Sequence, residues 1–451
     1  MDRTWKSVCK YLLLFFFCFF ILVFTYSIIT SDAIWNYGFS YAIARGEVPY
    51  VDFNMVVPPF SPIFYLIPFL FSNSYLVYLL FQSVLFVILF YFLEKLFTNK
   101  IYLLLLFFMI PFPVGNVMLI YPGYNFLLLL LFVLILYCEK KKVPDFWVGI
   151  LLGLCIFTKQ SVGIFLLLPS FYYLFQDKKR FFKRCLGIGL VCLFFLGYFL
   201  VSGNLWEFFN HCFLGLIDFS NSNRGDIISN IYFWLWLIPV GCLISFLIKK
   251  NHKLFTAYLL CFSTIALPIF DHYHTNLFLF VFLFFIISRI PWKSKWFMPW
   301  CFLMSVLFYL LSMGVVQHFR IPHIAHFNNF EIFKMSDIRE EEIYSLNRYL
   351  KPYDSNSIIF LTGDAYFFKI INDMDVNSYD LLNYGNHGYH GTEKILRKLK
   401  KEKNKIIILN SSEYKSLDST GQLNMKVIQY VLDYYNLERR VGDYEIYQKV
   451  S

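Results

Sequence analysis

The sequence predicts a helical membrane protein with many spans that carries a small α/β domain at its C-terminal end. Of 451 residues, 58% are hydrophobic and only 16% are charged, and a soluble domain of this length would not cover so much apolar surface. Apolar runs of about 17 to 25 residues, the length that crosses a bilayer as a helix, recur from residue 11 to residue 316. After residue 316 the pattern changes to short helices and strands of soluble type.

The apolar runs predict eleven membrane spans. They lie near residues 11–30, 74–94, 101–113, 121–138, 146–157, 161–176, 185–202, 230–248, 254–270, 276–288 and 297–316. The first run resembles a signal peptide, but no small-residue cleavage site follows it, so we interpret it as a retained span.

The distribution of basic residues predicts the orientation. Alternate connections between the spans hold nineteen Lys and Arg, whereas the opposite connections hold three. Cytoplasmic loops carry the excess of Lys and Arg, so we expect a multi-pass cell-membrane protein with a cytoplasmic N-terminus and an extracytoplasmic C-terminal region. The net charge of +10 therefore reflects topology, and we expect no nucleic-acid partner.

The C-terminal region, residues 317–451, predicts an α/β layer domain distinct from the membrane domain at 1–316. EEIYSLNRYLKPY, TEKILRKLKKEK and NMKVIQYVLDYYN have helical patterns, and SIIFLTG, KIIILN and YEIYQKV are predicted strands. The segment before them, QHFRIPHIAHFNN, is interpreted as a solvated linker. All ten cysteines precede residue 302, so no disulfide holds this domain together.

The first external loop, residues 31–73, carries the strongest candidate for catalysis. Asp32 follows the first span directly, and a carboxylate at the membrane surface usually has a chemical role. Such a group can deprotonate an acceptor hydroxyl as a general base; the alternative is that Asp32 only caps a helix. Asp52, in PYVDF, is a second candidate. Arg45, a rare basic residue on this side, is a candidate substrate contact.

Aromatic residues are frequent in the same loop, and lysine is scarce. Solvated loops rarely have this composition, so we expect the segment to lie on the bilayer. Four aromatic side chains would then sit at headgroup depth: Trp35, Tyr37, Tyr41 and Phe53.

Two further polar groups lie between apolar segments on the outer side. In GLCIFTKQSVG, Lys159 is a point charge suited to a phosphate, with Gln160 beside it; the alternative is a snorkelling lysine that ends a helix. In DHYHTN, His272 and Tyr273 are candidates for binding a phosphate or a sugar. Two alternatives stay open: a metal site of His272, His274 and Asp271, and simple anchoring of Tyr273 at the membrane interface.

These residues together resemble the GT-C membrane glycosyltransferases. The resemblance rests on an Asp after the first span, the PYVDF segment, the Pro58-Pro59 dipeptide and the outward TKQ loop, and DHYH resembles that family's outer HY element. It is greatest to the bacterial branch near the protein O-mannosyltransferases and the aminoarabinose transferase of lipid A, and it covers most of the chain. Many of those proteins also carry an outer C-terminal domain.

The resemblance implies a function as well as a fold. It implies an inverting transfer of a sugar from a polyprenyl-phosphate-linked donor to an external glycan, lipid or protein. Asp32 then matches the catalytic Asp, Lys159 the basic residue near the donor phosphate, and His272 and Tyr273 the HY element. Many relatives have an acidic pair after span one, whereas Ala33 follows Asp32 here, which leaves dependence on a divalent cation open.

Rival functions remain at this point. A lipid-linked glycan flippase or transporter would also have many spans, but such proteins tend to show internal repeats and helices broken deep in the membrane, and the sequence shows no repeat. A glycan polymerase of another fold would carry a large late external loop with several Arg, whereas residues 203–229 contain one. A purely structural scaffold is the third alternative.

Overall fold

The computed structural model describes residues 3–24, 31–96, 122–222, 230–248, 253–267, 270, 272–287, 323–335, 337–375, 387–401, 405–418 and 425–449. The chain forms two compact units. The helical unit comprises Met1–Ser27, Leu79–Phe194 and Gly225–Ile321, and the mixed unit comprises Ile28–Tyr78, Phe195–Arg224 and Pro322–Ser451. The mixed unit thus combines the first loop with the C-terminal region. The predicted division at residue 316 stays a prediction.

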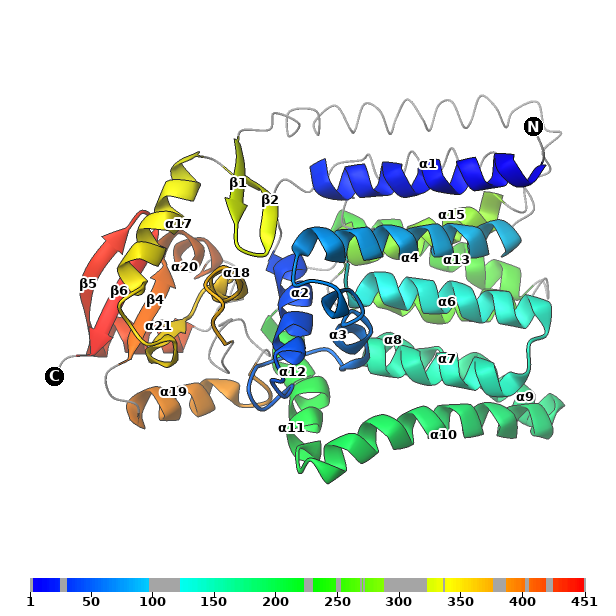
Figure 1. Ribbon diagram of the computed structural model, residues 1–451. Coiled ribbons are helices and arrows are strands. Elements are labelled where there is room, and N and C mark those ends of the chain that lie inside the picture. Colours follow the sequence, from blue (N-terminus) through cyan, green and yellow to red (C-terminus); the bar gives the residue numbers. More distant parts are fainter. Residues whose placement is uncertain are drawn as a thin grey trace. The chain divides into compact units, whose positions relative to one another are not determined.

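The helical unit contains most of the apolar helices (Figure 1). In chain order they are α1 (Arg3–Phe24), α4 (Tyr75–Leu96), α6 (Tyr124–Lys141), α7 (Asp145–Thr158), α8 (Gln160–Phe165), η3 (Leu168–Ser170), α9 (Phe171–Gln176), α10 (Lys178–Val201), α13 (Ile231–Ile248), α14 (Lys253–Phe262), η5 (Ser263–Ala266) and α15 (His272–Ile287). Among the described helices, α4, α10 and α13 are each long and apolar enough to cross a membrane.

The structure divides one predicted span into short helices and leaves the number of spans open. Residues 161–176 do not form one continuous α-helix, because α8, η3 and α9 follow one another there and Pro169 lies at the start of η3. The predicted spans 101–113 and 297–316 lie outside the described residues. The total of eleven therefore stays a prediction.

Glycines let two helices of this unit approach closely. A Cβ added to Gly149 of α7 would lie 2.2 Å from the carbonyl oxygen of Arg184 in α10, and one added to Gly187 would lie 2.2 Å from the carbonyl oxygen of Phe146. Small residues on facing helices allow such backbone contact within membranes. The backbones of α7 and α10 consequently pack directly against each other at these two glycines.

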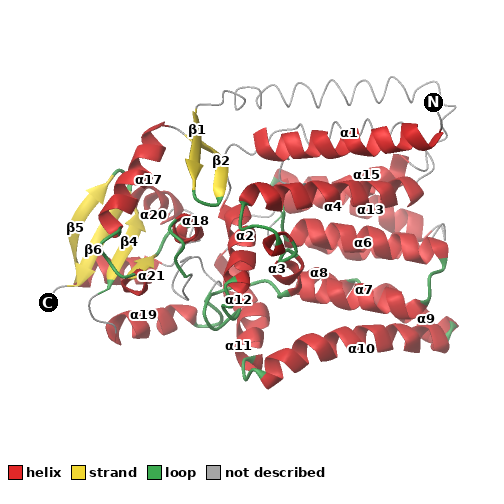
Figure 2. Ribbon diagram, in the orientation of Figure 1, coloured by secondary structure: helices red, strands yellow, loops and turns green. Residues whose placement is uncertain are grey.

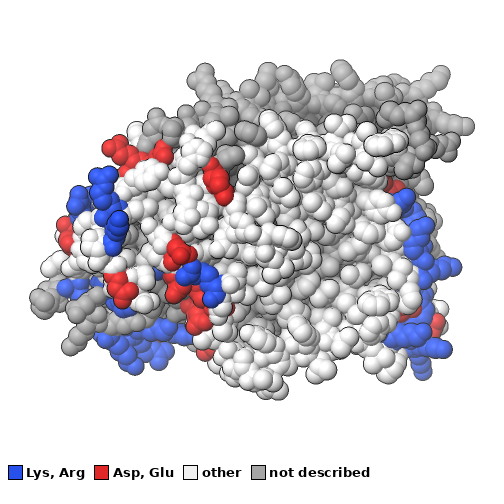
Figure 3. Space-filling view, viewed as in Figure 1, with Lys and Arg blue, Asp and Glu red and all other residues white. Residues whose placement is uncertain are grey.

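Basic side chains gather at one end of the helical unit, where α6 ends and α10 begins (Figure 3). Arg184 there is fully buried. Its Nη2 lies 2.6 Å from Glu139 Oε1 and 2.8 Å from Asp145 Oδ1, and its Nη1 donates to the Tyr258 hydroxyl at 2.9 Å. This network ties α6, α7, α10 and α14 together at the end that the charge pattern assigns to the cytoplasm.

The mixed unit combines short helices with two sheets (Figure 2). Before the C-terminal region it contains α2 (Ser31–Ala44), α3 (Phe60–Phe64), η1 (Pro68–Leu70), α11 (Leu205–Phe209), the π-helix η4 (Asn210–Leu214) and α12 (Gly215–Ser222). The C-terminal region adds β1 (His323–Phe327), β2 (Phe330–Met335), α17 (Asp337–Leu350), η7 (Ser355–Ser357), β3 (Ile358–Phe360), α18 (Ala365–Ile371), α19 (Gly391–Lys401), β4 (Ile406–Asn410), α20 (Ser411–Asp418), α21 (Met425–Tyr434), β5 (Tyr435–Val441) and β6 (Tyr444–Lys449).

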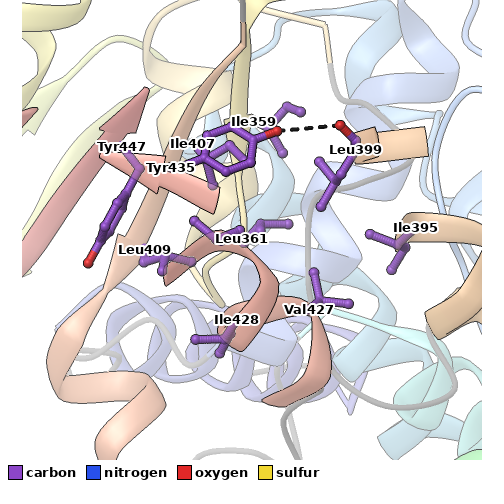
Figure 4. Packing of buried hydrophobic residues seen from close by; sticks show 11 residues of the cluster. Ile359, Leu361, Ile395, Leu399, Ile407, Leu409, Val427, Ile428, Tyr435 and Tyr447 are labelled. Atoms are coloured by element: carbon purple, nitrogen blue, oxygen red, sulfur yellow. Dashed lines mark hydrogen bonds between the residues drawn. The ribbon is translucent and has the colours of Figure 1, made fainter. Parts of the chain in front are cut away.

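The larger sheet has the strand order β3-β4-β6-β5, and only β3 and β4 are parallel. Alternate strand residues face opposite sides. On one side, Ile359 and Ile407 pack with Leu399 of α19 and Ile428 of α21 (Figure 4). On the other, the ring of Phe360 stacks on Phe368 of α18. The domain is therefore layered helix–sheet–helix, which is one form of the α/β layer domain that the sequence predicts.

The six predicted elements of this domain are confirmed as α17, β3, α19, β4, α21 and β6. The β1–β2 hairpin, α18, α20 and β5 were not predicted. The interpretation of QHFRIPHIAHFNN as a linker is wrong at its end, because His323–Phe327 pairs with β2. The predicted α21 was also too long, because Tyr435 begins β5.

Candidate functional site

Asp32 lies in the first turn of α2, where a carboxylate interacts favourably with the helix dipole. Its side chain is half-buried, and the Asn36 side-chain amide donates to its backbone carbonyl at 2.6 Å. Because α2 begins at Ser31, Asp32 is inside the helix and is not its N-cap. The helix therefore fixes the backbone position of Asp32.

The aromatic side chains of the first loop have protein neighbours. Tyr37, Tyr41 and Phe53 are fully buried, and the ring of Tyr37 meets Tyr75 and Tyr78 edge-on with centroids 5.1 and 5.0 Å apart. These three side chains therefore face protein and not lipid, and their depth at the headgroups stays a prediction. Composition alone does not distinguish a lipid-facing aromatic residue from one buried in protein.

Arg45, at the end of α2, is bound to acidic residues of the C-terminal region. Its Nη1 pairs with Asp373, and its Nη2 donates to Asp375 at 2.9 Å. The Tyr41 hydroxyl also donates to Asp373, at 2.8 Å. These contacts place Arg45 in an ion-pair network; its predicted contact with substrate stays a prediction.

Asp52 is exposed and closes a turn in the PYVDF segment. Its carboxylate accepts a hydrogen bond from the backbone N–H of Val48 at 2.7 Å. Within the turn, Tyr50 has a φ of 70°, which is rare for a bulky residue, and its buried hydroxyl donates to the carbonyl of Val57 at 2.8 Å. Asp52 therefore stabilises this turn through its hydrogen bond. A contact between Asp52 and substrate stays a prediction.

A buried contact that no local sequence pattern predicts ties this loop to the C-terminal region. Asn54 Nδ2 lies 2.7 Å from His387 Nδ1, and both side chains are buried. Since an amide nitrogen only donates, the histidine accepts at Nδ1. The partners are 333 residues apart in the chain, and neither belongs to a recognisable motif.

In the helical unit, Lys159 lies between the end of one helix and the start of the next. It adopts an extended conformation (φ −150°, ψ 100°) between α7 and α8, and its half-buried ammonium donates to Asn125 Oδ1 at 3.1 Å. The ring of Tyr124 lies 5.5 Å from the same nitrogen. Gln160, the first residue of α8, is buried. Lys159 therefore lies at the helix ends opposite the basic cluster of Figure 3.

Asn125 adds a second donor to this place. Its side chain is 1% exposed. Because an ammonium group only donates, the oxygen of the Asn125 amide must face Lys159. Its Nδ2 then points elsewhere and, among the described residues, is buried with no acceptor. A lysine beside a buried amide N–H in need of an acceptor suits an anion. Asn125 was not among the residues predicted from the sequence.

His272 and Tyr273 are the first residues of α15, and their side chains lie outside the described part of the structure, as does Asp271. Their predicted contacts stay predictions. Within the described ranges, no three His, Cys, Asp or Glu residues cluster in a way that could hold a metal ion. Asp32, Arg45 and Asp52 belong to the mixed unit, whereas Lys159, Gln160 and α15 belong to the helical unit.

Comparison with known proteins identifies the family. The sequence profile of glycosyltransferase family 87 matches residues 56–288, more than half of the chain. The chain belongs to glycosyltransferase family 87. The protein is thus a membrane glycosyltransferase, and its predicted resemblance to the GT-C superfamily is confirmed.

Two solved structures share the fold of this family 87 protein. ArnT from Cupriavidus metallidurans, solved bound to undecaprenyl phosphate, matches with a TM-score of 0.60 at 10% identity, over 100% of this chain and 99% of that one. The oligosaccharyltransferase of Archaeoglobus fulgidus in its apo form matches with a TM-score of 0.50 at 10% identity, over 93% and 72% of the two chains. No curated protein matches the sequence.

Proposed function

We propose that this family 87 protein transfers a sugar from a polyprenyl-phosphate-linked donor to an extracytoplasmic acceptor, with inversion and with Asp32 as the general base. The acceptor is a surface glycan, a lipid or a protein. The transfer takes place at the membrane domain, residues 1–316, through the first external loop at 31–73. The C-terminal domain at 317–451 is extracytoplasmic.

The observation that carries the proposal is the pair of donors at Lys159 and Asn125. They lie at the helix ends opposite the basic cluster, which the charge pattern assigns to the outer face. The buried Nδ2 of Asn125 has no acceptor among the described residues, and a buried polar group without a partner is costly. A phosphate oxygen would satisfy this N–H and would accept from the Lys159 ammonium as well.

The location favours a lipid-linked donor. Nucleotide sugars are made and kept in the cytoplasm, so they do not reach an external site. A polyprenyl-phosphate sugar arrives through the bilayer and presents its phosphate at headgroup depth. The fold is shared with an ArnT solved with undecaprenyl phosphate, which agrees with a donor of this chemistry.

The proposed chemistry needs one base. The acceptor oxygen attacks the anomeric carbon, the bond from that carbon to the phosphate oxygen breaks, and the acceptor proton moves to Asp32. Phosphate leaves without a strong acid, because the phosphate group delocalises the negative charge that develops on its departing oxygen. Asp52, Gln160, His272 and Tyr273 are proposed as further contacts to donor or acceptor, whereas the two carboxylates bound to Arg45 favour a positioning role for that residue.

The test is turnover by the full-length protein in lipid nanodiscs. Donors are polyprenyl-phosphate hexoses and pentoses labelled in the sugar, and an extracted cell-envelope fraction supplies the acceptor. We expect release of polyprenyl phosphate together with labelled product, only when the acceptor is present. A flippase would move the labelled lipid across a liposome bilayer without releasing polyprenyl phosphate, and that result would contradict the proposal.

A further inference from the structure

A helical segment of the C-terminal region follows α2 in register. Trp35 contacts Gly363, Gly38 contacts Tyr366 and Arg45 contacts Asp373. Each pair is separated by 328 positions in the chain. A constant separation means that α2 and the segment 363–375, which includes α18, run in the same direction side by side. We call residues 363–375 the splint.

The splint holds the first half of α2 through a hydrogen bond and a close fit. The indole Nε1 of Trp35 donates to the carbonyl of Gly363 at 3.0 Å. The N–H of Gly363 in turn donates to both carboxylate oxygens of Glu413, each at 2.9 Å. A Cβ added to Gly38 would lie 2.2 Å from Cδ1 of Tyr366. The helix therefore has little freedom to roll or slide at this point.

The other end of α2 is held by charge. Arg45 donates to Asp375 through Nε at 3.1 Å and through Nη2 at 2.9 Å, and its Nη1 pairs with Asp373. Asp373 has a φ of 53°, a left-handed conformation that Asp tolerates, at the end of α18. Two carboxylates on one guanidinium fix the direction of that side chain as well as its position.

We propose that the splint is a positioning element for sugar transfer, which holds α2 so that Asp32 keeps its place and direction. The inference rests on the proposed function of Asp32. Trp35 lies three residues after Asp32, so the two are neighbours on the helix surface. A displacement of about 1 Å at a reacting group can lower a rate by about a hundredfold. Trp35, Arg45, Asp373 and Asp375 are thus positioning residues.

A purely stabilising role fits the ion pairs less well. The side chains of Arg45, Asp373 and Asp375 are 29%, 66% and 60% exposed, and ion pairs between exposed side chains contribute little to stability. A positioning role requires only that these contacts favour one orientation of α2 over others, and weak contacts are sufficient for that. It therefore predicts a loss of turnover without a matching loss of stability.

The experiment compares two variants of the full-length protein that leave α2 folded. Asp373→Asn/Asp375→Asn removes the charges that hold Arg45, and Trp35→Phe removes the indole N–H but keeps an aromatic ring. The matched control is Asp433→Asn, which alters an exposed carboxylate bonded to Gln429 on α21. We expect kcat to fall about tenfold in each splint variant, with the donor KM and the melting temperature close to those of the parent.

Restoration by charge exchange is the second arm. Arg45→Glu alone should lower kcat in the same way, and Arg45→Glu combined with Asp373→Arg/Asp375→Arg should recover much of it. Recovery supports positioning, because a residue that binds substrate directly would not regain its contact. A higher donor KM in Arg45→Glu without recovery would assign Arg45 to substrate and overturn the inference.

Failure of the inference and failure of the proposed function are distinguishable. If both splint variants keep the kcat of the parent while Asp32→Asn is inactive, the splint has no positioning role and the proposed function stands. If kcat falls only together with the melting temperature, the splint is a stabilising contact alone. If Asp32→Asn is fully active, the proposed function itself fails.

Discussion

Replacement of Lys159 tests the donor site. Lys159→Ala removes an ammonium group that lies 3.1 Å from Asn125 Oδ1 and that is proposed to contact the donor phosphate. A hydrogen bond to a charged group contributes about 1.5 to 3 kcal/mol. At about 1.4 kcal/mol per factor of ten, the affinity for donor should fall roughly ten- to a hundredfold. Lys159→Arg should retain part of it if charge alone matters.

The assay is the initial rate of polyprenyl-phosphate release against donor concentration in nanodiscs, with competition by undecaprenyl phosphate as a measure of binding. Lys141→Ala is the matched control, because Lys141 is an exposed lysine at the far end of α6. Melting temperatures identify any variant that does not fold. A donor KM within twofold of the parent in folded Lys159→Ala would remove Lys159 from the donor site.

Three further predictions address topology, packing and pH. A reporter fused after residue 451 should be active only outside the cytoplasm; activity inside would overturn the orientation. Arg184→Ala should destabilise the protein by about 3 kcal/mol, because it removes the buried guanidinium between Glu139 and Asp145 and leaves both carboxylates to the more exposed Arg180 alone; an unchanged melting temperature would contradict this. Burial raises the pKa of Glu413 to about 7 from 4.5. The folded state therefore keeps a proton that the unfolded chain releases, and about 3 kcal/mol of stability, present below pH 4.5, is lost as the pH rises through 7. Glu413→Gln should flatten this decline in melts from pH 5 to 8; an unchanged slope would assign it to other groups.

Sequence patterns were sufficient to predict a strand where every residue of that strand is buried. β3 and β4 are buried at every residue, so they read as continuous apolar runs, and both were predicted. β5 is buried only at Tyr435 and Val441, its two ends, and its polar middle gives no strand signal. The strands of the β1–β2 hairpin are short, and β1 lies within a histidine-rich segment that resembles a polar linker.

The site was predictable as a set of residue types but not as a set of contacts. A carboxylate after the first span and a lysine between two spans stand out because charge is costly there. The partners of Arg45 and Asn54 lie more than 300 positions away, and no local pattern predicts such pairs. Asn125 was missed because a single amide at the start of an apolar helix resembles an ordinary helix end.

Turnover by Asp32→Asn tests the central claim most directly. The amide keeps the size of the side chain and its oxygen, but it does not accept the proton of the acceptor hydroxyl. General-base assistance contributes about a factor of 10² to 10⁴ in rate, so product formation with excess donor should fall by at least a hundredfold. Expression and melting temperature should stay close to those of the parent and of Asp354→Asn, a control at a structural turn where Asp354 accepts from the Asn356 N–H. Turnover within threefold of the parent would show that Asp32 is not the base.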